Sequence, residues 1–266
     1  MKQMSASFFA LVLALLMLGS TKTQVLAEGT APVAENLELQ TYRNVSLGGN
    51  LSAYDPEGGH LQYEITTKPV KGELHLEADG SFLYTPGENK RGRDYFGYKV
   101  MDEEGNLSQE ATVIIRIDKQ KSPVSYLDMK EHPAEYAAQV LAEKGIFIGK
   151  QVGGSYCFEP EQEICRGEFI RMCMTMLDIP FMPGNLSNWD EPLSTSQAAA
   201  IVNESLRISD VSYLSLESAL SEAEAQACAN LEACGILKQG RPLLETLSRE
   251  EAAQMLCNAL KLLENR

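Results

Sequence analysis

Residues 168–177 read EFIRMCMTML and place their apolar side chains on one helical face. The spacing of these side chains, i, i+3, i+4, i+7 and i+8, is that of an amphipathic helix. The same pattern recurs in QAAAIVNESL at 197–206 and in EAAQMLCNAL at 251–260. Because such helices bury their apolar faces only against one another, the recurrence predicts a stack of helical repeats.

The helix boundaries are marked as well. Ser194 with Gln197, and Ser248 with Glu251, have the spacing of capping boxes, in which two side chains satisfy orphan amides at a helix start. Segments 137–146 and 226–236 also match each other, and in both a glycine near the end favours the positive φ of a helix terminus. The predicted unit is a helix, a glycine-terminated loop and a capped helix.

The N-terminal part has a different composition. Residues 31–117 are rich in Thr, Tyr, Val and Gly, with turn signals between short alternating runs that predict strands at 61–65, 73–76, 81–84 and 112–117. Short strands separated in this way favour a β-sandwich. The polar run at 118–125 contains a proline and predicts a linker to the helical half.

Five motifs of this β-rich part keep a familiar order: APVA (31–34), LSAYDPEG (51–58), KPVKG (68–72), DGSFLYTP (79–86) and GRDYFGYKVMD (92–102). Together they resemble the bacterial cadherin-like or Ig-like repeats of exported proteins. The resemblance implies an all-β sandwich that serves as a spacer, an adhesion module or a calcium-stiffened rod.

Calcium is the one metal for which the sequence offers candidate ligands. It needs six or more oxygens from several segments, and Asp55, Glu57, Asp94 and Asp102 are weak candidates. The alternative is that these carboxylates cap backbone amides in turns.

The helical half resembles a second family. Residues YLD (126–128), GIFIG (145–149), FEP (158–160) and CRGE (165–168) are similar to the S-layer-homology (SLH) module. The resemblance predicts an all-α bundle with one full copy at 126–179, a truncated copy at 180–208 and a degenerate copy at 209–266. The second copy lacks a front helix and an arginine at its helix start, and the third lacks the opening aromatic-Asp pair.

The SLH resemblance implies three modules that bind anionic, often pyruvylated, wall polysaccharide in the grooves between them. An arginine at a helix start suits a carboxylate because its bidentate fork adds to the positive end of the helix. The alternative is that each arginine pairs with a neighbouring acid, such as Glu163 or Glu245, and only holds the repeats together. The candidate polysaccharide-binding residues are Arg166, Glu168, Arg249, Gly149, Lys150 and Asp128.

The N-terminus predicts export. Lys2 precedes an apolar stretch at 8–18 and a Val-Leu-Ala run at 25–27, which is typical of a signal peptide at 1–27. The alternative is an uncleaved anchor. Cleavage would leave a secreted chain without a membrane span, on the surface or wall of a bacterium.

Charge and cysteine placement exclude some functions. The formal net charge is -14, and the two lysines of residues 1–27 are not balanced by any acid there, so the mature chain is more acidic still. Such a chain repels phosphate backbones, and we expect no nucleic-acid partner. Cys173, Cys228 and Cys257 fall on apolar helical faces, which favours reduced core cysteines over disulfides.

No catalytic motif is found. The histidines at 60, 75 and 132 have no metal-ligand spacing, and HExxH, GxSxG and phosphate-binding glycine loops are absent from the sequence. We therefore expect a protein that is not an enzyme and needs no cofactor. The predicted function is noncovalent attachment to the cell wall, with the β-domain projecting outward. The alternative is a structural protein whose repeats contact a second copy or another surface protein.

Overall fold

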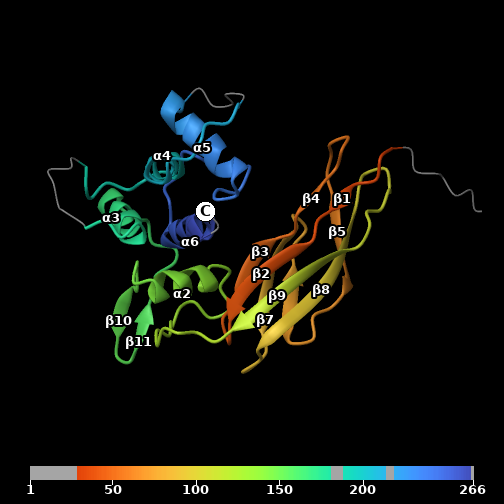
Figure 1. Cartoon of the computed structure of the whole chain (residues 1–266), viewed down its shortest axis with the longest axis horizontal. Coiled ribbons are helices and arrows are strands. Elements are labelled where there is room, and N and C mark those ends of the chain that lie inside the picture. The colour runs from red at the N-terminus through yellow and green to blue at the C-terminus, as the bar shows by residue number, and fades with distance from the viewer. Residues whose placement is uncertain (1–28, 181–187, 214–218, 265–266) are drawn as a thin grey trace, which may run out of the picture.

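The computed structural model describes residues 29–180, 188–213 and 219–264, which form a β-sandwich and a group of helices (Figure 1). The predicted signal peptide lies outside the described residues. Among these residues, no helix is long and apolar enough to cross a membrane.

The sandwich consists of two main sheets. One has the order β2-β9-β8-β5, from Leu37–Tyr42, Ala111–Asp118, Gly92–Met101 and Gln62–Thr67. The other has the order β3-β7-β6, from Leu47–Asn50, Ser81–Pro86 and Gly72–Leu76. A short pair joins β1 (Val33–Ala34) to β4 (Ala53–Tyr54). Only β2 and β9 pair in parallel; the other pairs described are antiparallel.

Alternation explains the core of the sandwich. In β9, Val113, Ile115 and Ile117 point inward and are buried, while the residues between them are more exposed. They belong to the same hydrophobic cluster as Tyr84 of β7 and Tyr98 of β8, which are also fully buried. All four strands expected from alternation are confirmed, with small shifts at their ends.

The helical half contains five helices among the described residues. They are α2 (Glu135–Glu143), α3 (Arg166–Met176), α4 (Thr195–Leu206), α5 (Glu222–Ala233) and α6 (Arg249–Glu264). A hairpin of β10 (Lys150–Val152) and β11 (Ser155–Cys157) separates α2 from α3. Both predicted capping boxes are present, and Gly145 and Gly235 have the expected positive φ.

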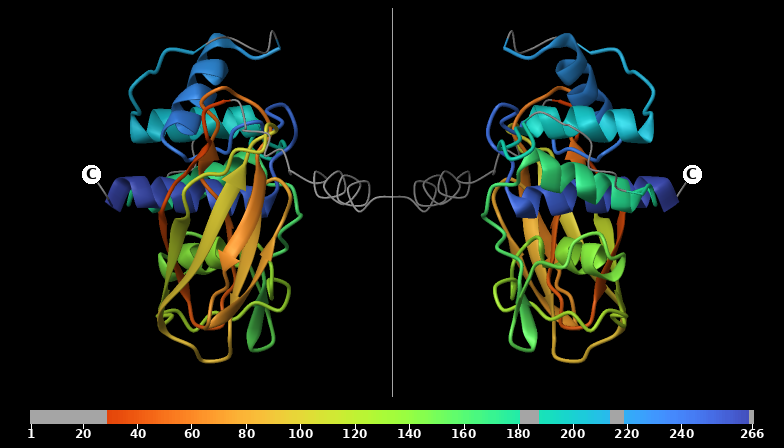
Figure 2. Two further views of the ribbon diagram at one scale, coloured as in Figure 1. Left: turned by 90° about the vertical axis from the view of Figure 1, so that its right-hand side faces the viewer. Right: turned by 90° about the vertical axis from the view of Figure 1, so that its left-hand side faces the viewer.

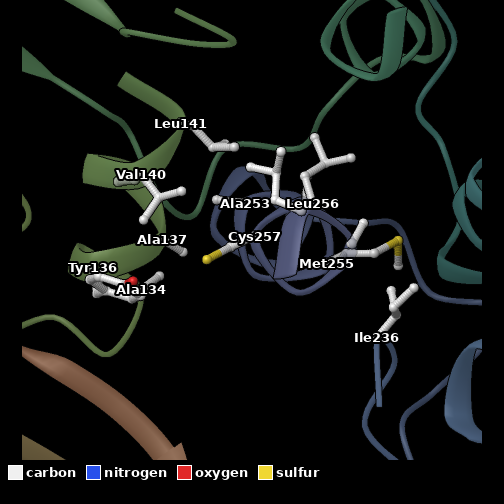
Figure 3. Packing of buried hydrophobic residues seen from close by; sticks show 14 of the residues in the cluster. Ala134, Tyr136, Ala137, Val140, Leu141, Ile236, Ala253, Met255, Leu256 and Cys257 are labelled. Atoms are coloured by element: carbon white, nitrogen blue, oxygen red, sulfur yellow. The ribbon is translucent and has the colours of Figure 1, made fainter. Parts of the chain in front are cut away.

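The helices pack in a cyclic order. The front helix α2 packs on α6, and the front helix α5 packs on α4, the capped helix that precedes it in the chain. Figure 3 shows Ala137, Val140 and Leu141 of α2 on the side of α6 that carries Cys257. Each front helix thus covers the capped helix of a neighbouring repeat. Between α3 and α4 the described residues contain no front helix, and residues 181–187 lie outside them, so the truncation of the second copy stays a prediction.

The helical half contacts the sandwich through an edge strand. Gly48 of β3 donates its amide to the Pro133 carbonyl at 3.1 Å, and the Ser46 amide donates to the Glu135 carboxylate at 2.9 Å. Because β3 is at the edge of its sheet, these bonds satisfy groups that would otherwise be free to pair with another chain. Burial raises the pKa of Glu135, although the bond from Ser46 opposes this.

The segment between the halves is also held in place. The Tyr42 ring lies 5.4 Å from that of Tyr136, and its hydroxyl donates to the Glu143 carboxylate at 2.9 Å. The same carboxylate accepts the backbone amide of Lys121, in the predicted linker. Buried residues of both halves also form one hydrophobic cluster. Figure 2 shows that α6 runs across the strand direction of the sandwich. The division into independent folding units stays a prediction.

Candidate functional site

The three capped helices begin around one point. Ile164, Leu193 and Leu247 each lie two residues before the first residue of a capped helix, and all three are fully buried. The amide of Ile164 donates to the Leu247 carbonyl, that of Leu247 to Leu193, and that of Leu193 to Ile164, at 3.0, 2.7 and 3.2 Å. This closed ring of hydrogen bonds relates the three segments by a pseudo-threefold arrangement.

The helix starts repeat the arrangement in detail. In each helix the first amide donates to a carbonyl of the loop that leads to a neighbouring capped helix, and so does the second. For the first amide the pairs are Arg166 to Glu191, Thr195 to Glu245 and Arg249 to Gln162. For the second they are Gly167 to Trp189, Ser196 to Leu243 and Glu250 to Pro160.

These bonds decide how the helix starts can bind an anion. The positive end of a helix resides in its unpaired N-terminal amides. Here the first two amides of each helix already donate to protein carbonyls, and in α4 and α6 a serine side chain takes the third. We call the contact between the start of one capped helix and the loop of its neighbour a seam. Any anion bound at such a seam must therefore be held mainly by side chains.

Arg249 lies buried inside one seam. Its guanidinium donates to the Phe158 carbonyl at 2.7 Å and pairs with the carboxylates of Glu159 at 3.1 Å and Glu168 at 3.6 Å. It also lies 5.1 Å from the centre of the Phe147 ring. The contacts are those of the alternative in which the arginine holds the repeats together, with other acids than the expected Glu245. The Arg249 side chain is only 7% exposed and its Nε is buried, so the fork presents no open edge to solvent.

Arg166 is placed differently. It is half-buried at the start of α3, and none of the ion pairs among the described residues involves it. Glu163, its expected partner, instead accepts a hydrogen bond from Thr246 at 2.8 Å. The half-buried Trp189 covers the next residue, since a Cβ on Gly167 would lie 2.0 Å from the indole. This seam therefore combines a guanidinium without a carboxylate partner and an aromatic ring.

The other candidates support the loops. The Asp128 carboxylate accepts the amides of Phe158 at 2.9 Å and Glu159 at 2.7 Å, and so orients the loop that surrounds Arg249. Gly149 has a positive φ, and a Cβ there would lie 2.4 Å from the Cys157 carbonyl oxygen. Lys150 is exposed at the start of β10. The structure brings Arg249 and Glu168 together, whereas Arg166 belongs to a different seam.

The four calcium candidates are not gathered into one site. Asp94 is buried and accepts the amides of Val70 and Lys71 and the Tyr84 hydroxyl. Asp55 accepts the Glu57 amide, and Glu57 accepts that of Thr30. Each of these carboxylates accepts backbone amides, as in the alternative that the sequence left open, but only Asp55 does so within its own turn; Asp94 and Glu57 accept amides of distant segments.

Asp102 shows the physical consequence of such capping. Burial tends to raise its pKa, but hydrogen bonds from the side chain and amide of Asn106 hold the pKa below its ordinary value. The carboxylate is thus stabilised as an anion by the protein alone. No group of three or more His, Cys, Asp or Glu side chains in the described ranges could hold a metal ion.

The six cysteines are free thiols. Burial raises the pKa of Cys173 to about 12, and burial also raises the pKa of Cys257. A thiol needs a lowered pKa to act as a nucleophile at neutral pH, so these two are suited to packing. The expectation that the chain is not an enzyme stays a prediction.

Trp189 and the aromatic partners of Arg249 were missed from the sequence. Trp189 is the only tryptophan, and it lies shortly before a capped helix, which is the signal that could have drawn attention to it. Phe147 and Phe158 were quoted only as parts of motifs. Their role depends on contacts across about a hundred residues of chain, for which sequence spacing gives no signal.

The fold defines a β-sandwich followed by a pseudo-threefold group of helix starts, and comparison with known proteins identifies the first part. Residues 29–119 match the family model of the bacterial cadherin-like domain, so the resemblance read from the motifs is confirmed for this domain. No match to an SLH module is found in the helical half, where that resemblance stays a prediction. A search of curated proteins finds no match to the chain.

Solved structures give partial similarities. An endo-fucoidan hydrolase of glycoside hydrolase family 107 is 22% identical over 35% of this chain and 14% of its own, with a TM-score of 0.29. The SrpA adhesin of Streptococcus sanguinis is 16% identical over 38% and 68%, with a TM-score of 0.30. A SusE-like surface-located polysaccharide-binding protein of Bacteroides thetaiotaomicron is 19% identical over 34% and 15%, with a TM-score of 0.26. The chain spans only a small part of the first and third of these proteins.

Proposed function

We propose that this protein is exported and attaches noncovalently to the bacterial cell wall, through its helical half, by binding an anionic wall polysaccharide. The observation that carries the proposal is the seam at the start of α3, where Arg166 has no carboxylate partner among the described residues. A guanidinium of this kind is suited to the carboxylate of a pyruvylated or other acidic sugar.

The surroundings of Arg166 support the proposal. Trp189 provides an apolar surface on the neighbouring loop, and Gly167 leaves room for its ring. Arg249 has another role here: it closes the neighbouring seam, which stabilises the arrangement that presents Arg166. The β-domain would then act as the spacer or adhesion module that projects from the wall.

Sedimentation with purified cell walls tests the proposal. We expect Arg166→Ala to leave most of the protein in the supernatant, while the wild type sediments with the walls. Arg93→Ala is the matched control, because Arg93 is an exposed arginine of the β-domain and its loss changes the net charge equally. Equal sedimentation of the wild type and the Arg166 variant would remove this arginine from the mechanism.

A second function is favoured by the burial of Arg249. If the repeats serve only to pack together, the protein is a structural component of a surface assembly that contacts itself or another surface protein. This alternative predicts no wall sedimentation for the wild type, and a dimer or larger species in light scattering at micromolar concentration. A monomer that sediments with walls contradicts it.

A further inference from the structure

A groove of about 810 Å³ lies between the two halves of the molecule. The sheet β3-β7-β6 lines one side, and residues of α2, α6 and the loop before α6 line the other. Binding sites for small ligands commonly fall between about 300 and 1,000 Å³ and often form where domains meet. The groove therefore has the size and the place of a ligand site.

The wall formed by α6 is polar. Gln254, Asn258 and Lys261 are spaced by four and three residues, so they share one face of the helix, and all three line the groove. His75 and Ser81 face them from the sandwich. Amides, a hydroxyl and an imidazole supply both donors and acceptors, which suits the hydroxyl groups of a sugar.

The cations of the groove stand out in an acidic chain. Lys238, Arg241 and Lys261 line it, against the single carboxylate of Glu77, whereas the whole chain has a net charge of -14. Lysine and arginine in a concave surface attract anions from solution. The charge of the groove thus points to a negatively charged ligand.

The partners of these cations differ. Lys238 pairs with Asp79 across the two halves at 3.4 Å, but both side chains are more than half exposed, so the pair is weak. Arg241 pairs with Glu251. Lys261 has no carboxylate partner in the part of the chain that the structure describes; its ammonium lies 3.4 Å from the Asn258 side-chain oxygen. Lys261 is therefore the cation most available to a ligand.

The aromatic residues argue against a nucleic acid. Single-stranded nucleic acids bind by stacking bases on exposed aromatic faces. Phe82 and Tyr136 both line the groove, but they are only 4% and 8% exposed, and the Lys261 ammonium lies 5.8 Å from the centre of the Tyr136 ring. These two rings therefore offer little accessible surface on which a base could stack.

We propose that this groove binds an acidic oligosaccharide, with a sugar carboxylate on Lys261 and hydroxyl groups on the amides of α6. The site is separate from the Arg166 seam and does not depend on wall attachment through that seam. Because both halves line it, an occupied groove would also hold the β-domain against the helices.

Calorimetric titration of the full chain with an oligogalacturonate tests the proposal. We expect saturable binding that weakens as salt is added, because exposed charges are screened. A neutral maltooligosaccharide of equal length is expected to give no measurable heat of binding. If oligogalacturonate fails to bind, or if the neutral sugar binds equally well, the proposal is overturned.

Two variants locate the site. Lys261→Ala is expected to weaken oligogalacturonate binding about tenfold or more, a loss of about 1.4 kcal/mol. Lys68→Ala, an exposed lysine outside the groove, makes the same change in charge and should leave the affinity within about twofold of wild type. An equal effect of the two variants would indicate attraction by overall charge and would refute the site.

Arg166→Ala separates this proposal from wall attachment. We expect it to keep the affinity of the wild type for oligogalacturonate even where it abolishes sedimentation with walls. Loss of oligogalacturonate binding in Arg166→Ala, with binding intact in Lys261→Ala, would place the probe in the helical seam and contradict the groove.

Discussion

Replacing Gly48 with alanine tests whether the contact between the two halves is a built part of the fold. A Cβ on Gly48 would lie 2.7 Å from the Pro133 carbonyl oxygen and 2.9 Å from its Cα. These are backbone atoms, so they cannot rotate away as the end of a long side chain can. Alanine therefore forces the segment before α2 away from β3.

The magnitude follows from the contacts that are lost. Overpacking at a close contact costs about 1–3 kcal/mol, and loss of the bond from the Gly48 amide to Pro133, 3.1 Å long, adds about 1 kcal/mol. Glycine-to-alanine replacement also restricts the unfolded chain, which returns about 0.4–1 kcal/mol. We expect a net loss of about 2 kcal/mol in the free energy of unfolding.

Urea unfolding followed by two probes measures this loss. Fluorescence of Trp189, the only tryptophan, reports on the helical half, and far-ultraviolet circular dichroism reports on both halves. The wild type should unfold in one transition by both probes. For Gly48→Ala, the fluorescence midpoint should move to a lower urea concentration. Gly154→Ala is the control, because a Cβ there meets nothing within 4 Å and its φ is not positive. Equal midpoints for the two variants would refute the reasoning.

Three further substitutions test single features. Arg249→Met should lower the free energy of unfolding by about 2 kcal/mol, a figure reduced from that of a fully buried pair because Glu159 is 44% exposed; an unchanged urea midpoint contradicts the buried pairing. Cys165→Ser should raise it by about 1 kcal/mol in thermal melts, because the α3 cap position has no side-chain hydrogen bond whereas Ser194 provides one in α4. The folded-state pKa of Glu135 is raised above its ordinary value of 4.5. Wild-type stability should therefore fall as pH rises from 4.5 through the raised pKa of the folded state. Urea titrations at several pH values should show a flatter pH dependence for Glu135→Gln.

The sequence predicted the elements whose signals are local. The capped helices and the strand at 112–117 have apolar spacing that can be read without knowing their neighbours. β3 was missed because LGGN lacks β-branched residues, and its glycines serve the approach of Pro133 and of Phe82. The β10–β11 hairpin was also missed, although Gly153 and Gly154 form the two-residue turn that commonly signals a hairpin.

The candidate site was predictable only in part. The recurrence of apolar helices and capping boxes predicted that the helical repeats would stack, but the ring formed by the three helix starts is a finding of the structure. What each arginine contacts depends on loops far away in the chain: Arg249 meets Phe158 and Glu159, about ninety residues earlier. Sequence spacing cannot distinguish an arginine enclosed by such loops from one that faces outward, and this is why both arginines entered as candidates.

The hydrogen bonds at the helix starts restrict what wall binding can look like. The first two amides of each capped helix donate to protein carbonyls in all three seams, and α3 differs only in having no side-chain cap for its third amide, so the seams differ mainly in their side chains. The α4 seam begins with Thr195 and has no arginine there, and the guanidinium of the α6 seam is enclosed by Glu159 and Glu168. A polysaccharide that requires a guanidinium therefore has one seam open to it, at Arg166. Wall binding through the helical half should accordingly follow a single-site isotherm, and this single site should vanish with Arg166→Ala.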